Sequence, residues 1–266
     1  MNKTLYKTNI KANWGIFAFI FGMLMIYVST SIAMFNPENA DAMKAMFDMM
    51  PEGMIKAFGF TGLGTELTGY LAGYLYGFIL IVFPLIYTAI IANKMIAGHV
   101  DNGSMAYLLA TPNTRKRVAG TQAIFLASTS ALLIVIITGI IILMSAAVFP
   151  GHLEIPSFLL LNLVTLLLLV AVGGIGFLAS CIFSDKKYSL AVGAGIPVLF
   201  VLFKMLADIS EKVEFFRYFS IYSLLDAHRI LEDVPYALIV GGSLLALSIV
   251  LYIAGIVIFN RKSLAI

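Results

Sequence analysis

The chain has 266 residues, of which 61% are hydrophobic and 12% are charged, and its formal net charge is +3. A soluble domain typically has about 25% charged residues, and a soluble fold of this size has too much surface to hide so many apolar side chains. The composition therefore excludes a cytosolic enzyme, a nucleic-acid-binding domain and a disordered chain. It predicts an all-α protein that crosses a lipid bilayer several times.

Six apolar runs are long enough to cross a bilayer, since each is near or above the ~20 residues that a spanning helix needs. They cover residues 14–35, 68–93, 119–148, 158–183, 188–207 and 237–259. The first run exceeds the ~7–15 apolar residues of a signal peptide. We therefore expect it to be retained as the first of six transmembrane helices.

The distribution of charge predicts the orientation of these helices. The two termini and the connections after the second and fourth runs contain 11 Lys and Arg residues against two acids, whereas the other connections contain six against 12. Lys and Arg concentrate on the cytoplasmic side of membrane proteins. We therefore expect both termini to be cytoplasmic, in a multi-pass protein of the plasma membrane, most simply a bacterial one.

Four segments outside the apolar runs have characteristic patterns. Residues 1–13, with Tyr6 and Ile10 four residues apart beside lysines, predict an amphipathic interfacial helix. Residues 36–67 predict two short amphipathic helices on the outer surface, and 208–236 a broken helical cap. Residues 94–118 form a cytoplasmic loop, and the whole chain 1–266 reads as one transmembrane domain.

Small residues and prolines mark the interior of the runs. Gly69, Gly73 and Gly77 recur at four-residue spacing, which predicts a flat stripe for helix packing. The glycines of the fourth and fifth runs suggest the same role, and these are Gly173, Gly174, Gly176, Gly193 and Gly195. Pro84 and Pro197 interrupt their helices and are expected to act as hinges.

The deep parts of the runs contain almost no ionisable residues. An ion-coupled secondary transporter usually needs buried carboxylates or broken helices, and a membrane-embedded enzyme needs a catalytic set at depth. His99, His152 and His228 all fall in or near loops, and the single cysteine, Cys181, lies in an apolar run. The sequence therefore predicts no metal site and no catalytic site, and no cofactor is expected in this chain. An ion-coupled secondary transporter and a membrane-embedded enzyme remain the alternative functions.

The loop between the second and third runs has the most distinctive sequence. Asp101 or Asn102 can start a short helix with Gly103 and Ser104. Leu108 and Leu109, with Met105, give this helix an apolar side, and Thr111 and Pro112 end it. We expect a partly apolar helix of this kind either to be covered by a partner protein or to lie on the lipid headgroups.

These features resemble the ABC-2 type permeases. The family has six spans and an acid-x-Gly-Thr/Ser-x-x-x-Leu-Leu-x-x-Pro-x-x-Arg segment after the second. The segment corresponds here to Asp101, Gly103, Ser104, Leu108, Leu109, Pro112 and Arg115, and includes Asn102, Tyr107 and Thr111. A C-terminal Phe-x-Arg/Lys-x-x-Leu corresponds to Phe259, Arg261 and Leu264. Asp101 and Ser104 stand where Glu and Thr are common.

The resemblance implies the transmembrane domain of an ABC exporter of the type V kind. The segment from His99 to Thr111, followed by Arg115, would be a coupling helix that docks into a separate ATPase subunit. Two ATPase copies and a second permease, identical or a close paralogue, would complete the unit. The chain has no GxxxxGK[ST] segment, so ATP and Mg²⁺ are expected on the partner, and this subunit is expected to be non-catalytic.

The resemblance also bears on the cargo. Uncharged, aromatic-rich spans suit export of a hydrophobic or amphipathic molecule, such as a peptide toxin, an antibiotic or a lipid-like compound. The large external loop is similar to that of permeases that export amphipathic toxic peptides, such as the phenol-soluble modulin exporter. An importer permease would carry a cytoplasmic Glu-Ala-Ala…Gly segment, which this chain does not contain.

Overall fold

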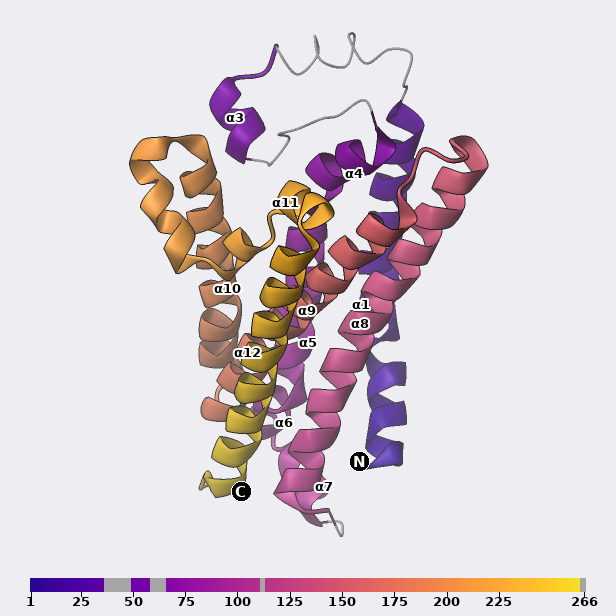
Figure 1. Cartoon of the computed structure of the whole chain (residues 1–266). Helices are drawn as coiled ribbons and strands as arrows, with labels where there is room; N and C mark the ends of the chain where they lie inside the picture. Colours follow the sequence, from indigo (N-terminus) through magenta and orange to yellow (C-terminus); the bar gives the residue numbers. More distant parts are fainter. Residues whose placement is uncertain (36–48, 58–65, 111–112, 264–266) are drawn as a thin grey trace.

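A computed structural model describes residues 1–35, 49–57, 66–110 and 113–263, and within these ranges the regular structure is entirely helical. The helices run side by side along one axis, with both termini at one end and α3, α4 and α11 at the other (Figure 1). Among the described residues, five helices are long and apolar enough to cross a membrane, or six if one bent pair counts as a single span. The all-α, multi-span prediction is confirmed.

The spanning helices agree closely with the six apolar runs. Five of them are α1 (Lys3–Met34), α8 (Arg115–Val148), α9 (Ile155–Ile182), α10 (Lys186–Ile209) and α12 (Val234–Arg261). The remaining span, which is the second in chain order, consists of the bent pair α4 (Leu67–Tyr76) and α5 (Ile79–Met95). Most of α9 is buried, because it packs against α5, α8, α10 and α12. The core of the molecule is therefore arranged around α9.

The second span is broken, which the sequence did not predict. The axes of α4 and α5 differ by 42° across Gly77 and Phe78. By contrast, α5 contains Pro84 and α10 contains Pro197 without interruption. The only break recorded within a described span therefore lies seven residues before the proline that was expected to act as a hinge.

Glycines allow close approach where α9 crosses its neighbours. A Cβ added to Gly176 would lie 2.9 Å from the Cβ of Ala92 on α5, and one added to Gly193 would lie 3.2 Å from the Cα of Gly176. Gly173 and Gly174 have similar contacts with α12, whereas Gly195 faces open space. Gly73 and Gly77 line a polar cavity, which the packing prediction did not include.

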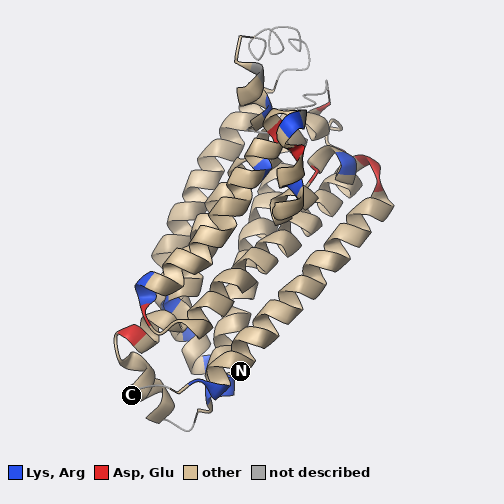
Figure 2. Cartoon of the chain, turned by 90° about the vertical axis from the view of Figure 1, so that its left-hand side faces the viewer, with Lys and Arg blue, Asp and Glu red and all other residues tan. Residues whose placement is uncertain are grey.

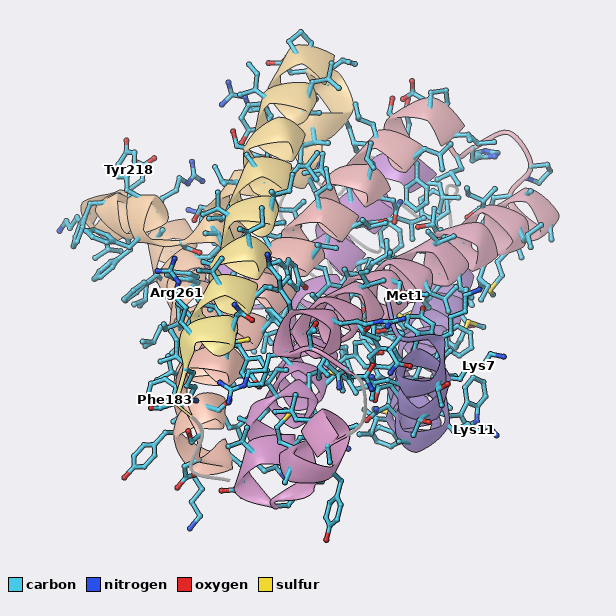
Figure 3. All side chains as sticks on the ribbon, turned by 90° about the horizontal axis from the view of Figure 1, so that it is seen from below. Met1, Lys7, Lys11, Phe183, Tyr218 and Arg261 are labelled. Atoms are coloured by element: carbon cyan, nitrogen blue, oxygen red, sulfur yellow. The ribbon has the colours of Figure 1, made fainter. Side chains whose placement is uncertain are left out.

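The amino-terminal segment is helical but is not a separate interfacial helix. It continues without a break into α1, and Tyr6 faces α8, where its hydroxyl lies 2.8 Å from Ser128 Oγ. Asn9 is buried and donates a hydrogen bond to Gln122. Lys7 and Lys11 point away from the bundle (Figure 3). The first turns of α1 thus have two different sides: polar side chains contact α8 on one side, and lysines point outward on the other.

Two connections at the end opposite the termini contain short helices where they are described. α3 (Glu52–Ala57) covers part of the second helix expected in 36–67, and the first lies outside the described residues. The segment after α10 consists of η2 (Glu211–Phe219), η3 (Ile221–Leu224) and α11 (Ala227–Glu232). It has the form expected of a broken helical cap.

Candidate functional site

The loop with the distinctive sequence folds into two short helices rather than one. These are α6 (Ala97–Asp101) and α7 (Ser104–Ala110), and they lie at the same end of the molecule as both termini (Figure 1). His99 and Asp101 belong to α6, whereas Tyr107, Leu108 and Leu109 belong to α7. We call residues 97–110 the elbow.

Gly103 separates the two helices for a conformational reason. Its φ is +72°, in the left-handed region where a Cβ is strained. No atom lies within 4 Å of the position that a Cβ would occupy. The requirement for glycine therefore comes from the backbone turn and not from lack of space.

Polar side chains close this turn. Asn102 Oδ1 accepts hydrogen bonds from the Ser104 backbone N at 3.0 Å and from Ser104 Oγ at 2.6 Å. Ser104 Oγ also lies 2.8 Å from His99 Nδ1. Of the two residues expected to start a helix, Asp101 ends α6 and Asn102 is its C-cap, while α7 begins at Ser104. Burial lowers the pKa of His99 below its usual value of 6.5, which keeps the ring neutral near pH 7.

The two faces of α7 have different surroundings. Met105 is 1% exposed and Leu108 and Leu109 pack against the core, whereas the Tyr107 side chain is 81% exposed. The apolar side is thus covered by the chain itself at Met105 and in part at Leu108 and Leu109. The aromatic residue that remains available on the outer side of α7 is Tyr107. Thr111 and Pro112 lie outside the described residues.

Hydrogen bonds from distant parts of the chain hold both ends of the elbow. The backbone N–H groups of Ile96 and Ala97 donate to Ser180 Oγ on α9, at 3.3 and 2.9 Å. Ser180 is fully buried, and the sequence analysis missed it. Its hydroxyl accepts hydrogen bonds from a segment more than 80 residues away along the chain, which the apolar run around it does not indicate.

The residues that follow the elbow are held by segments near the two chain termini. The Arg115 guanidinium donates to the carbonyl of Lys262, and Lys262 Nζ donates to the carbonyl of Cys181 at 3.3 Å. Asn2 Nδ2 donates to Asn113 Oδ1 at 2.9 Å. The structure therefore brings together the two sequence motifs, around Arg115 and around Arg261, at one end of the bundle.

This end is predominantly basic. Lys and Arg side chains cluster near both termini, with few acids among them, whereas both signs are mixed at the opposite end (Figure 2). Viewed from below, Met1, Phe183 and Arg261 lie around this face (Figure 3). Within the described ranges, no three His, Cys, Asp or Glu side chains are grouped so that they could hold a metal ion.

These features describe a multi-pass helical membrane protein with an anchored elbow at its basic end. The chain belongs to the ABC-2 family transporter proteins, whose family model matches residues 12–264. It is accordingly a membrane subunit of an ABC transporter, a class that works with a partner ATPase subunit. A search of curated proteins finds no match to the sequence.

Proposed function

We propose that this subunit belongs to an exporter, which moves a hydrophobic or amphipathic cargo out of the cell by alternating access. The elbow carries this proposal. It presents Tyr107 outward at the basic end of a chain that belongs to the ABC-2 family, while Met105, Leu108 and Leu109 pack against the bundle. An exposed aromatic residue on a supported helix suits insertion into a pocket on a partner protein.

The anchors of the elbow would transmit the movement of the ATPase to the spans. Ser180 ties the start of the elbow to α9, and Arg115 ties its end to the C-terminus of α12. Asn113 adds a link to the start of α1. Closure of an ATPase pair would push on α7 and displace these helices together, as a packed element moves between two discrete arrangements.

The assembly follows from the same proposal. Two ATPase subunits would bind ATP and Mg²⁺, and a second permease, identical or a paralogue, would complete the pathway. The excess of Lys and Arg at the elbow end favours a cytoplasmic location of both termini in a bacterial plasma membrane. Spans with few charged residues, and an outer loop whose sequence predicts amphipathic helices, favour a peptide toxin, an antibiotic or a lipid-like molecule as cargo.

Two exposed tyrosines, at opposite ends of the molecule, allow a test of ATPase docking on α7. Tyr107→Ala is expected to reduce co-purification of the ATPase at least tenfold, because one buried aromatic anchor contributes about 2 kcal/mol or more to an interface. Tyr218 on η2 is 89% exposed at the other end, and Tyr218→Ala should leave co-purification unchanged. Equal ATPase recovery from both variants would refute docking through α7.

The orientation is tested separately by cysteine labelling in intact cells. Asn113→Cys should react only when a thiol reagent reaches the cytoplasm, and Lys212→Cys should react with an impermeant reagent from outside. Cys181 is buried and contributes little background. The reverse labelling pattern would invert the proposed topology.

A further inference from the structure

A polar cavity lies at the end of the molecule opposite the elbow. It has a volume of about 430 Å³ and is enclosed by residues of α3, α4, α10, η2 and α11. This volume is within the range of about 300–1,000 Å³ that is typical of small-ligand sites. We call it the outer cavity. Its charged residues lie outside the elbow and outside the glycine stripe of the second span.

Charged groups of both signs line the outer cavity. Lys204 Nζ lies 3.0 Å from Asp208 Oδ2, and these side chains are only 12% and 20% exposed. Arg217 lies 3.6 Å from Asp208 and 3.8 Å from Glu214. Lys56 and Asp226 are also in the lining. The lining thus contains three Lys or Arg side chains and three Asp or Glu side chains, and it also includes His228.

The break in the second span forms part of the same wall. Gly73, Tyr76 and Gly77 line the cavity, and the 42° bend between α4 and α5 follows directly after them. Irregular backbone within a membrane is tolerated where it borders a water-filled cavity, since water or a ligand satisfies the polar groups. The cavity therefore explains why the helix can be broken at this point.

A buried hydrogen-bond network holds this wall in place. Tyr76 Oη donates to Asn162 Oδ1 on α9 at 2.7 Å, and Thr138 Oγ1 on α8 donates to the same oxygen at 2.7 Å. Asn162 in turn donates to the carbonyl of Phe158 at 2.8 Å. The last turn of α4 is therefore fixed to two other spans, which favours a preformed cavity.

We propose that the outer cavity binds a zwitterionic group, with an ammonium and a carboxylate or phosphate in one ligand. A ligand with a single charge would leave one unbalanced charge in a site that is partly shielded from water, which is costly. A dipolar ligand can exchange partners with the existing ion pairs without adding net charge. A peptide segment and a phospholipid headgroup both supply this chemistry.

The identification of this ligand with the transported cargo rests on the proposed function, but the binding itself does not. An ATPase-independent assay therefore separates the two. Ser210 lines the cavity and is exposed, and the only native cysteine, Cys181, is buried. Ser210→Cys thus provides one accessible thiol, whose rate of maleimide alkylation reports on occupancy.

The experiment uses the full chain in phosphatidylglycerol nanodiscs with acetyl-Lys-Glu-amide as the peptide probe. This peptide should slow alkylation of Ser210→Cys in a saturable manner, whereas acetyl-Lys-Gln-amide, which has one charge, should not. Adding Arg217→Gln or Glu214→Gln should raise the half-protecting concentration about three- to fivefold, as loss of a partly exposed ion pair predicts. Lys212→Gln, outside the lining, is the matched control.

A second arm distinguishes the two sources of the zwitterion. Protection by phosphatidylethanolamine added to the nanodiscs, without protection by the peptide, would uphold the site and assign it to a lipid headgroup. The proposal is overturned if neither ligand protects the thiol, or if the singly charged peptide protects it equally. Neither result depends on whether the elbow binds an ATPase.

Discussion

Gly103 is the residue on which the geometry of the elbow most directly depends. Its φ of +72° favours glycine, although the space around it is open. Gly103→Ala is expected to destabilise the turn by about 1–2 kcal/mol. The strain should reorient α7 and reduce ATP hydrolysis stimulated by the permease, which is measured in the reconstituted complex.

Gly151 supplies the matched control for this substitution. It has a φ of +84° and open space, but it lies in the connection between α8 and α9 at the opposite end. Gly151→Ala should impose similar strain without changing ATPase stimulation. If the two variants lose stimulation equally, the effect of Gly103 is general destabilisation rather than coupling.

His99 gives the elbow a predicted pH dependence. Burial in the folded elbow lowers the pKa of His99 below 6.5. An elbow that has unfolded locally exposes His99 and therefore binds a proton more readily than the folded elbow. The stability due to neutral His99 is present above pH 6.5 and is lost as the pH falls towards the lowered pKa. The slope is at most about 1.4 kcal/mol per pH unit.

Hydrogen exchange of the amides in α6 and α7 measures this dependence once intrinsic rates are corrected. Protection should be constant from pH 8 to 7 and decrease below pH 6.5 in the native chain. His99→Gln removes the titrating group, so its protection should not change over this range. Equal protection of the native elbow at pH 8 and pH 5 would contradict the assignment.

At the scale of the elements, the crossing of α5, α9 and α10 depends on small residues. Gly176 has Ala92 Cβ 2.9 Å from the position of an added Cβ, so Gly176→Ala forces helices apart. We expect a loss of about 1–3 kcal/mol, typical of overpacking, measured by thermal unfolding in detergent. Gly195→Ala, where no neighbour lies within 4 Å, should retain native stability. Unchanged unfolding of Gly176→Ala would show that the crossing adjusts freely.

The elements differ in how far the sequence predicts them. The long helices are predictable because hydrocarbon demands about 20 apolar residues in a row. The start of α7 is predictable from Asn102 and Gly103, whose side-chain and backbone preferences act locally. The break after Tyr76 is not, because it borders a cavity that residues of α10 and η2 form only in the folded chain.

In the candidate site, too, the sequence predicts some features and not others. The pattern around Leu108 and Leu109 predicts an apolar face, but not that the chain itself covers it. The anchors are pairings between segments far apart in the sequence, such as Ser180 with Ala97 and Arg115 with Lys262. Nothing local distinguishes these residues as partners, since many other residues of the same types occur in the chain.

At the scale of the whole molecule, the two ends have different chemistry. The basic end carries the elbow, the termini and the exposed Tyr107, and the opposite end carries the outer cavity with its mixed charges (Figure 2). α9 connects them, because Ser180 contacts the elbow and Asn162 holds Tyr76 at the cavity wall. A displacement imposed at the elbow can therefore reach the cavity through one central helix.

The central claim is that α7 contacts the ATPase that drives this subunit. Site-specific photo-crosslinking in intact cells tests it most directly, with a photoreactive amino acid in place of Tyr107 and, as the control, in place of Tyr218. We expect a crosslink between position 107 and the ATPase, and none from position 218. A crosslink from position 218 with none from position 107 would contradict it.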